Sequence, residues 1–123
     1  MEEYSYKNLR VYSKAVDYVV HVYNLLSKFP KEEQYALCDQ LRRAAVSIPS
    51  NIAEGMGRMS ARERAHFVEI SYGSLSEVNC QLDIAQRLGY INEKEHKMMD
   101  SESIELAKML SGLRASLLST LDS

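Results

Sequence analysis

Residues 40–55, QLRRAAVSIPSNIAEG, are the most informative stretch of this 123-residue chain. Apolar residues in and beside the stretch recur at intervals of three and four, which is the spacing of one face of an α-helix. Pro49 lies inside the pattern, where it removes one backbone hydrogen bond at a cost of about 3 kcal/mol. Because the spacing continues in phase beyond Pro49, the sequence predicts a kinked helix that does not end there. The apolar row comprises Leu37, Leu41, Ala44, Ala45, Ile48 and Ile52.

Three further segments have helical periodicity, and turn-forming residues separate the four. The breaks fall at Pro30, at Gly55 with Gly57, and at Gly89, which is expected to end a helix as its C′ residue. Helices joined by short loops pack most simply as antiparallel neighbours. The sequence therefore predicts an all-α fold, an antiparallel up-down-up-down four-helix bundle, as one domain over residues 1–123. The expected helices span residues 10–28, 31–57 with a kink near Pro49, 61–88 and 93–121.

Local signals mark three of the expected helix starts. Pro30 is a favoured first-turn residue, so the second helix is expected to begin beside it. Ser60 and Glu63 have the spacing of a capping box, in which each side chain satisfies a free backbone donor of the other. Asn92 and Glu95 resemble a second capping pair, which places the start of the fourth helix.

The first expected helix carries two neighbouring apolar rows. A helix of an isolated bundle needs one apolar stripe about 100° wide. The opposite side is polar, and His21 on that side is expected to be a solvated histidine. The polar residues are Arg10, Lys14, Asp17, His21, Asn24 and Lys28. The surplus apolar surface predicts that the chain self-associates through this helix. One row is Tyr12, Val16, Val19, Tyr23 and Leu26, and the other is Val11, Ala15, Tyr18, Val22, Leu25 and Phe29.

A polar row runs beside the apolar row of the second helix, and the third helix carries polar residues at matching spacing. Polar groups left unpaired at a helix interface cost stability. We therefore predict an interhelical hydrogen-bond network that fixes the register of pairing, and a ligand pocket is the alternative interpretation. The predicted network comprises Gln40, Ser47, Asn51, Glu54, Ser74, Glu77 and Gln81.

Arginines are concentrated around the expected turn between the second and third helices. Residues 42–64 contain five arginines but only two carboxylates, Glu54 and Glu63. Because the guanidinium fork matches phosphate oxygens, the segment is a candidate nucleic-acid contact, and an ordinary solvated surface is the alternative. Oligomerisation would repeat the patch and strengthen binding through many simultaneous contacts. The candidate residues are Arg42, Arg43, Arg58, Arg62 and Arg64.

Two Glu-x-x-His pairs, Glu63 with His66 and Glu93 with His96, have the spacing used by di-iron helical bundles. Both pairs fall in first turns of antiparallel neighbours, so they are expected at opposite ends of the bundle. The sequence contains no nucleophile elbow and no phosphate-binding loop. We therefore expect neither enzymatic activity nor a metal or other cofactor.

Composition and charge are those of an ordinary globular domain. The chain is 46% hydrophobic and 26% charged, and its formal net charge is −2, so no overall field attracts nucleic acid or membrane. No apolar run approaches the roughly 20 residues that span a bilayer. Cys38 and Cys80 lack a CxxC spacing and follow no signal-peptide pattern, so we expect buried, reduced thiols and a cytoplasmic protein.

Three groups of residues carry a family resemblance: residues 9–12 (LRVY), residues 40–55, and residues 73–77 (GSLSE) with Gln81 and Leu82. In these residues the chain resembles a bacterial four-helix bundle protein of the 23S rRNA intervening-sequence family, and the run RRAAxSIPSNIAEG is specific to it. The resemblance covers nearly the whole chain and implies a bundle that assembles as a homopentamer. Such proteins are similar in turn to the accessory variability determinant of diversity-generating retroelements, a basic barrel that binds nucleic acid, whereas this chain is slightly acidic.

Two functional hypotheses follow. The leading one is a non-enzymatic homo-oligomeric scaffold that contacts RNA, DNA or a nucleic-acid-processing protein. The alternative is a protein–protein interaction module without nucleic-acid contact, in which the arginines form surface or interface ion pairs.

Overall fold

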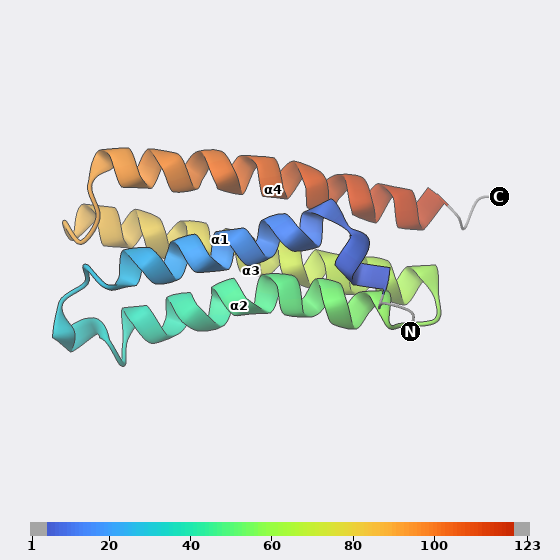
Figure 1. Ribbon diagram of the computed structural model, residues 1–123, viewed down its shortest axis with the longest axis horizontal. Coiled ribbons are helices and arrows are strands. Elements are labelled where there is room, and N and C mark those ends of the chain that lie inside the picture. Colours follow the sequence, from blue (N-terminus) through green and yellow to red (C-terminus); the bar gives the residue numbers. More distant parts are fainter. Residues whose placement is uncertain (1–4, 120–123) are drawn as a thin grey trace.

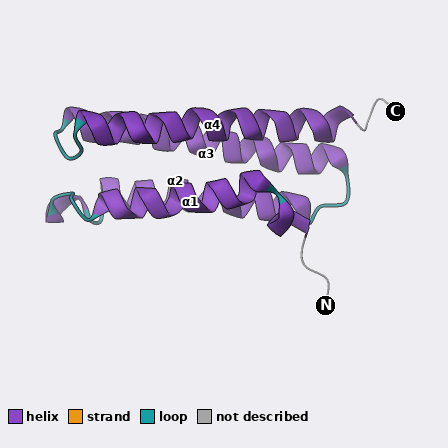
Figure 2. Ribbon diagram, turned by 45° about the horizontal axis from the view of Figure 1, so that its top comes forward, coloured by secondary structure: helices purple, strands orange, loops and turns teal. Residues whose placement is uncertain are grey.

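The computed structural model describes residues 5–119, which form four long α-helices in an all-α bundle (Figure 1). Consecutive helices run in opposite directions, and the described residues contain no strand. In Figure 2, α1 and α2 form one layer and α3 and α4 the other. The predicted fold class is confirmed, and the predicted helix end at residue 121 lies outside the described residues. The helices are α1 (Arg10–Leu26), α2 (Leu37–Met56), α3 (Ala61–Arg87) and α4 (Glu93–Ser119), with short 3₁₀ helices η1 (Ser5–Asn8) and η2 (Lys31–Glu33).

The core lies along the bundle axis and is built from the apolar rows. From α2, Leu41, Ala45 and Ile48 are completely buried. Helix α2 continues through Pro49, which is itself buried. Buried Ser71 and Ser103 make hydrogen bonds across helices: the Ser71 hydroxyl donates to the Ile48 carbonyl at 2.8 Å. The hydroxyls of Tyr18 in α1 and Ser103 in α4 are 2.7 Å apart.

The second helix begins later than predicted. It was expected from residue 31, but η2 and a turn precede it, and the Ala36 backbone is non-helical at φ −121° and ψ −102°. The Glu33 carboxylate accepts the Leu37 backbone N–H at 3.4 Å and the Tyr90 hydroxyl at 2.8 Å. Glu33 lies outside α2, yet its carboxylate accepts one of the free backbone N–H groups of the first turn of α2. In a continuous helix from Pro30, that N–H group would bond to a backbone carbonyl of the same helix.

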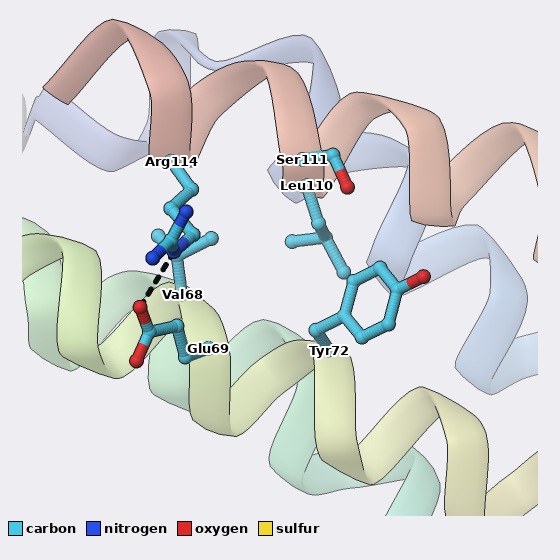
Figure 3. A pocket seen from close by; sticks show the side chains of 6 residues that line it. All are labelled: Val68, Glu69, Tyr72, Leu110, Ser111 and Arg114. Carbon is cyan, nitrogen blue, oxygen red and sulfur yellow. Dashed lines mark hydrogen bonds and ion pairs between the residues drawn. The ribbon is translucent and has the colours of Figure 1, made fainter. Parts of the chain in front are cut away.

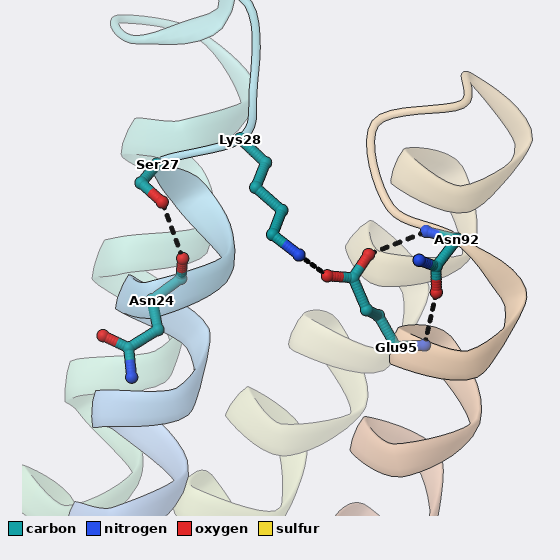
Figure 4. A network of polar contacts seen from close by, with 5 residues as sticks. All are labelled: Asn24, Ser27, Lys28, Asn92 and Glu95. Atoms are coloured by element: carbon teal, nitrogen blue, oxygen red, sulfur yellow. Dashed lines mark hydrogen bonds and ion pairs between the residues drawn. The ribbon is translucent and has the colours of Figure 1, made fainter.

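The predicted helix-end signals around α3 and α4 are present. Ser60 accepts the Glu63 backbone N–H at 3.0 Å, and Gly89 has the left-handed φ of +81° that ends α3. Asn92 and Glu95 form a reciprocal capping box, with bonds of 2.9 and 2.8 Å (Figure 4). The second carboxylate oxygen of Glu95 pairs with the Lys28 ammonium of α1.

The capping geometry predicts unequal effects of two alanine substitutions. Asn92→Ala is expected to lower the free energy of unfolding by about 1–2 kcal/mol, because it removes an N-cap on which the reciprocal bond also depends. Ser60→Ala removes one bond and is expected to cost about 1 kcal/mol or less. Urea denaturation of both variants at one protein concentration measures the difference. A loss from Ser60→Ala as large as that from Asn92→Ala would contradict it.

The polar side of α1 lies against α4, where His21, which the sequence predicted to be solvated, meets a carboxylate. The Lys14 ammonium is 3.1 Å from the Glu105 carboxylate, and His21 Nδ1 is 2.5 Å from Glu102 Oε1. With Lys28 and Glu95, these contacts place a ladder of charged and polar pairs along the α1–α4 seam. The side chains of Lys14 and His21 nevertheless remain about half exposed.

Candidate nucleic-acid interface

The structure divides the five candidate arginines between two places. Arg58, Arg62 and Arg64 lie at the turn from α2 to α3, whereas Arg42 and Arg43 lie in the first turns of α2. At 1.5 Å per residue the two sets are separated by roughly 20 Å along the bundle. They do not form one patch within a subunit.

The α2–α3 turn positions its arginines through contacts within the chain. Arg58 Nη2 is 3.1 Å from Glu54 Oε1, and its guanidinium lies 4.8 Å from the centre of the Phe67 ring. Arg64 Nε donates to the Arg58 carbonyl at 2.7 Å. Arg62 is exposed and makes no ion pair with any residue between 5 and 119. Two guanidinium groups are therefore held in place, and the third is unengaged beside them.

A buried glycine brings α2 close to α3 at this end. A Cβ placed on Gly55 would lie 2.6 Å from the Phe67 Cβ and 3.3 Å from the Arg64 carbonyl oxygen. Both distances are shorter than ordinary van der Waals contact. The absence of a side chain at residue 55 thus sets the spacing of the helices that carry the turn.

The other two arginines have different surroundings. Arg42 donates to the Gln34 carbonyl at 3.2 Å and to Gln34 Oε1 at 2.8 Å, so it braces the segment before α2. Arg43 is 82% exposed and has one long ion pair, 3.9 Å, with Asp39. Arg42 therefore holds the segment before α2 in place, whereas Arg43 is an exposed charge that the rest of the chain hardly engages.

The residues of the predicted interhelical network make both cross-helix and local contacts. The hydroxyls of Ser47 and Ser74 are 2.5 Å apart, which links α2 to α3. Gln81 Nε2 donates to Glu77 at 3.0 Å and, weakly, to Gln40 at 3.4 Å, while its own Oε1 is buried without a partner. The remaining two make local contacts: Asn51 donates to the Ser47 carbonyl within α2, and Glu54 pairs with Arg58 in the turn that follows α2.

Clefts indent the surface of the bundle, and one of them is lined by exposed Cys80 together with the His96–Asp83 pair, whose Nε2 and Oδ1 atoms are 2.7 Å apart. Another cleft of about 470 Å³ lies between α3 and α4, where Arg114 Nε is 2.5 Å from Glu69 Oε2 beside Tyr72 (Figure 3). Glu63 and His66 begin α3 at one end of the bundle, and Glu93 and His96 begin α4 at the other (Figure 1). Among residues 5–119, no three or more His, Cys, Asp or Glu side chains form a group that would hold a metal ion.

The two cysteines differ in exposure, so the expectation that both are buried is wrong for one of them. Cys38 is buried in the core, and burial raises the pKa of its thiol. Cys80 is exposed on α3, because its position falls on the outward side of that helix. Within the described part of the chain, no helix is both long and apolar enough to cross a membrane.

Apolar side chains remain exposed on every one of the four helices, among them Val46 of α2 and Met98 and Ile104 of α4, whereas the sequence singled out α1 alone. On α1, Val16, Val20 and Tyr23 are 37%, 51% and 44% exposed. Ile70 and Ile84 on α3 and Leu88 directly after it are 39%, 45% and 54% exposed. Their helical spacing was the available signal, but polar and glycine residues between them concealed it.

Comparison with known proteins identifies similar sequences and folds. A family model described as 23S rRNA-intervening sequence protein matches residues 7–112. The chain is similar in structure to a Bacteroides thetaiotaomicron protein of unknown function from the S23 ribosomal protein family. The two are 22% identical with a TM-score of 0.78, over 85% of this chain and 97% of that chain. That likeness concerns the fold alone, and none of the curated proteins compared matches the chain.

Proposed function

The chain belongs to the 23S rRNA-intervening sequence protein family, and from this premise we propose that it is a non-enzymatic, homo-oligomeric scaffold that binds nucleic acid in the cytoplasm. RNA is the first polyanion to test, since the family description refers to 23S rRNA. Five copies are the expected assembly. Duplex DNA and a nucleic-acid-processing protein are the other partners that the proposal allows.

The observation that carries this proposal is the gathering of Arg58, Arg62 and Arg64 at the α2–α3 turn. Arginine forks match phosphate geometry, and a held guanidinium loses little conformational freedom when it binds. In a closed ring of subunits, every copy presents this end at the same rim. Several weak phosphate contacts then act together, which compensates for the low net charge of one chain.

The proposal predicts that Arg62→Gln weakens binding of a labelled structured RNA and reduces its salt dependence. Removing one arginine–phosphate pair should lower the slope of log affinity against log salt by roughly 0.7–0.9 per copy engaged. Fluorescence anisotropy at low and moderate salt measures both quantities. Arg43→Gln is the matched control, because it removes the same charge from an exposed arginine about 20 Å away and should change neither quantity appreciably.

Absence of RNA or DNA binding by the unmodified protein at micromolar concentration and low salt would reject direct nucleic-acid contact. The alternative, a protein–protein interaction module, would then stand. One observation favours that alternative: Arg58 and Arg64 already make contacts within the chain, to Glu54 and to the Arg58 carbonyl.

A further inference from the structure

Met59, in the turn from α2 to α3, is almost completely exposed. Its exposed fraction is 96%, whereas that of Met98, on α4, is 60%. A single exposed apolar side chain is ordinary on a protein surface, so exposure alone assigns it no role. Two further features of the turn distinguish Met59: the backbone on both sides of it is held, and arginines lie beside it.

Hydrogen bonds hold the chain before and after Met59. Before it, the Arg58 carbonyl accepts Arg64 Nε at 2.7 Å. After it, the Ser60 hydroxyl accepts the Glu63 backbone N–H at 3.0 Å and caps α3. The backbone position of Met59 is therefore fixed, although nothing in the described chain covers its side chain. A partner that covers this side chain would have little backbone freedom to remove.

The charge beside Met59 is positive. Arg58 precedes it, and exposed Arg62, which makes no ion pair with any residue between 5 and 119, follows three positions later. Tyr35 offers a comparison, because it is 94% exposed in the connection between α1 and α2, but residues 32–33, both glutamates, come shortly before it. Carboxylates repel phosphate, and guanidinium groups attract it. Met59 thus combines full exposure with guanidinium neighbours, and Tyr35 does not.

A nucleotide presents the two kinds of surface that this turn can cover. Arginines bind the phosphates without reading the bases. The face of an unpaired base is an aromatic surface, against which a side chain can pack whatever the base is. Methionine is unbranched and polarisable, and its sulfur makes favourable contacts with aromatic rings. Met59 can therefore cover a base face while the arginines beside it bind phosphates.

Met59 fits an unpaired base better than a base step within a duplex. An apolar wedge that enters a duplex must unstack the bases, at a cost comparable to what the burial of one methionine returns. The nearby ring of Phe67 gives little help, since the Arg58 guanidinium lies over it, 4.8 Å from its centre. Bases in RNA loops and bulges can be splayed out without that cost.

We propose that Met59 packs against an unpaired RNA base while the neighbouring arginines bind the adjoining phosphates, so that the turn selects RNA with loops or bulges. The inference rests on the proposed function and adds the class of RNA that this site prefers. It is independent of the number of subunits.

Fluorescence anisotropy with two labelled RNAs tests the preference. One is a stem closed by a loop of unpaired bases, and the other is the same stem as a blunt duplex. Met59→Ala should weaken binding of the stem-loop about fivefold to tenfold, because apolar contact area is lost, and should change duplex binding less than about twofold. The slope of log affinity against log salt should not change, since no charge is removed.

Two further variants serve as controls for Met59→Ala. Met59→Leu keeps an apolar side chain of similar size and should retain most of the affinity for the stem-loop. Tyr35→Ala removes an equally exposed side chain from the other end of the bundle and should change the affinity for neither RNA. All three variants should unfold at the temperature of the unmodified protein, because neither side chain is buried.

Oxidation footprinting reports the contact in the unmodified protein. Dilute peroxide converts exposed methionine to its sulfoxide, and peptide mass spectrometry follows the rate at each residue. Saturating stem-loop RNA should slow the oxidation of Met59 several-fold and leave that of Met98 unchanged, because α4 begins at the opposite end of the bundle (Figure 1). If anionic phospholipid vesicles protect Met59 and RNA does not, the turn contacts a membrane surface and the inference is overturned.

The results separate this inference from the proposed function. If Met59→Ala binds both RNAs as the unmodified protein does, or loses affinity for both equally, Met59 does not contact an unpaired base. RNA binding that still responds to Arg62→Gln would then leave the proposed function standing. If the unmodified protein binds neither RNA, both are rejected.

Discussion

Gly55→Ala is expected to lower the free energy of unfolding by about 1–3 kcal/mol, although alanine is the better helix former by about 1 kcal/mol. The added Cβ would lie 2.6 Å from the Cβ of Phe67, a distance that carbon atoms do not adopt. Because the opposing atom is next to the α3 backbone, a rotamer change cannot relieve the clash, and the helices must separate. Gly55→Val adds two more methyl groups and should destabilise the bundle further.

Gly112→Ala provides the control for this prediction. Gly112 is also within a helix but has open space around its Cβ position, so the variant should gain up to about 1 kcal/mol from helix propensity. Urea denaturation at one fixed protein concentration compares the variants, since assembly makes apparent stability depend on concentration. Equal stabilisation by Gly55→Ala and Gly112→Ala would show that α2 and α3 are not in close contact at Phe67.

Tyr18→Phe is expected to cost about 1–3 kcal/mol at neutral pH, because it leaves the buried Ser103 hydroxyl without its partner. Removing both hydroxyls with Tyr18→Phe and Ser103→Ala should restore part of that loss, since no polar group is then stranded in the core. The double-mutant cycle separates the pair from the packing of either side chain. If the double variant loses as much unfolding free energy as the two single variants together, the two hydroxyls are not coupled.

The same tyrosine makes stability depend on alkaline pH. Burial raises the pKa of Tyr18 from its ordinary value of 10.0 to about 12, although the Ser103 hydrogen bond acts in the opposite direction. Since the pKa is higher in the folded state, this contribution is fully present below pH 10 and is lost as pH rises toward 12. Relative to Tyr18→Phe, the unmodified protein should lose up to roughly 3 kcal/mol across that interval. Parallel pH profiles of the two proteins that keep a constant difference would contradict the shift.

Signals that act within one turn of helix were readable from the sequence, and they located most of the fold. Ser60, Gly89 and Asn92 marked ends correctly because capping depends on residues three or four positions away. The start of α2 was predicted too early because its cap is unusual. Glu33 reaches forward to Leu37 while it also binds Tyr90, a residue 57 positions away.

The candidate site was less predictable, because its geometry also depends on contacts between residues far apart in the sequence. Proximity in sequence suggested one arginine cluster, but α2 is long enough to carry Arg43 and Arg58 to different levels of the bundle. His21 was expected in solvent because its partner on α4, Glu102, lies 81 positions away. Helical periodicity tells which side of a helix is polar, but it does not tell which helix that side meets.

The charged ladder between α1 and α4 has a consequence for the order in which the bundle forms during synthesis. Helix α4 leaves the ribosome last, after α1, α2 and α3 have had time to associate, and the seam it completes joins the first helix to the last. Opposite charges attract over about 8–10 Å at physiological ionic strength, which is farther than apolar contact reaches. Positive and polar groups on α1 and carboxylates on α4 can therefore draw the arriving helix into place before its leucines lose water.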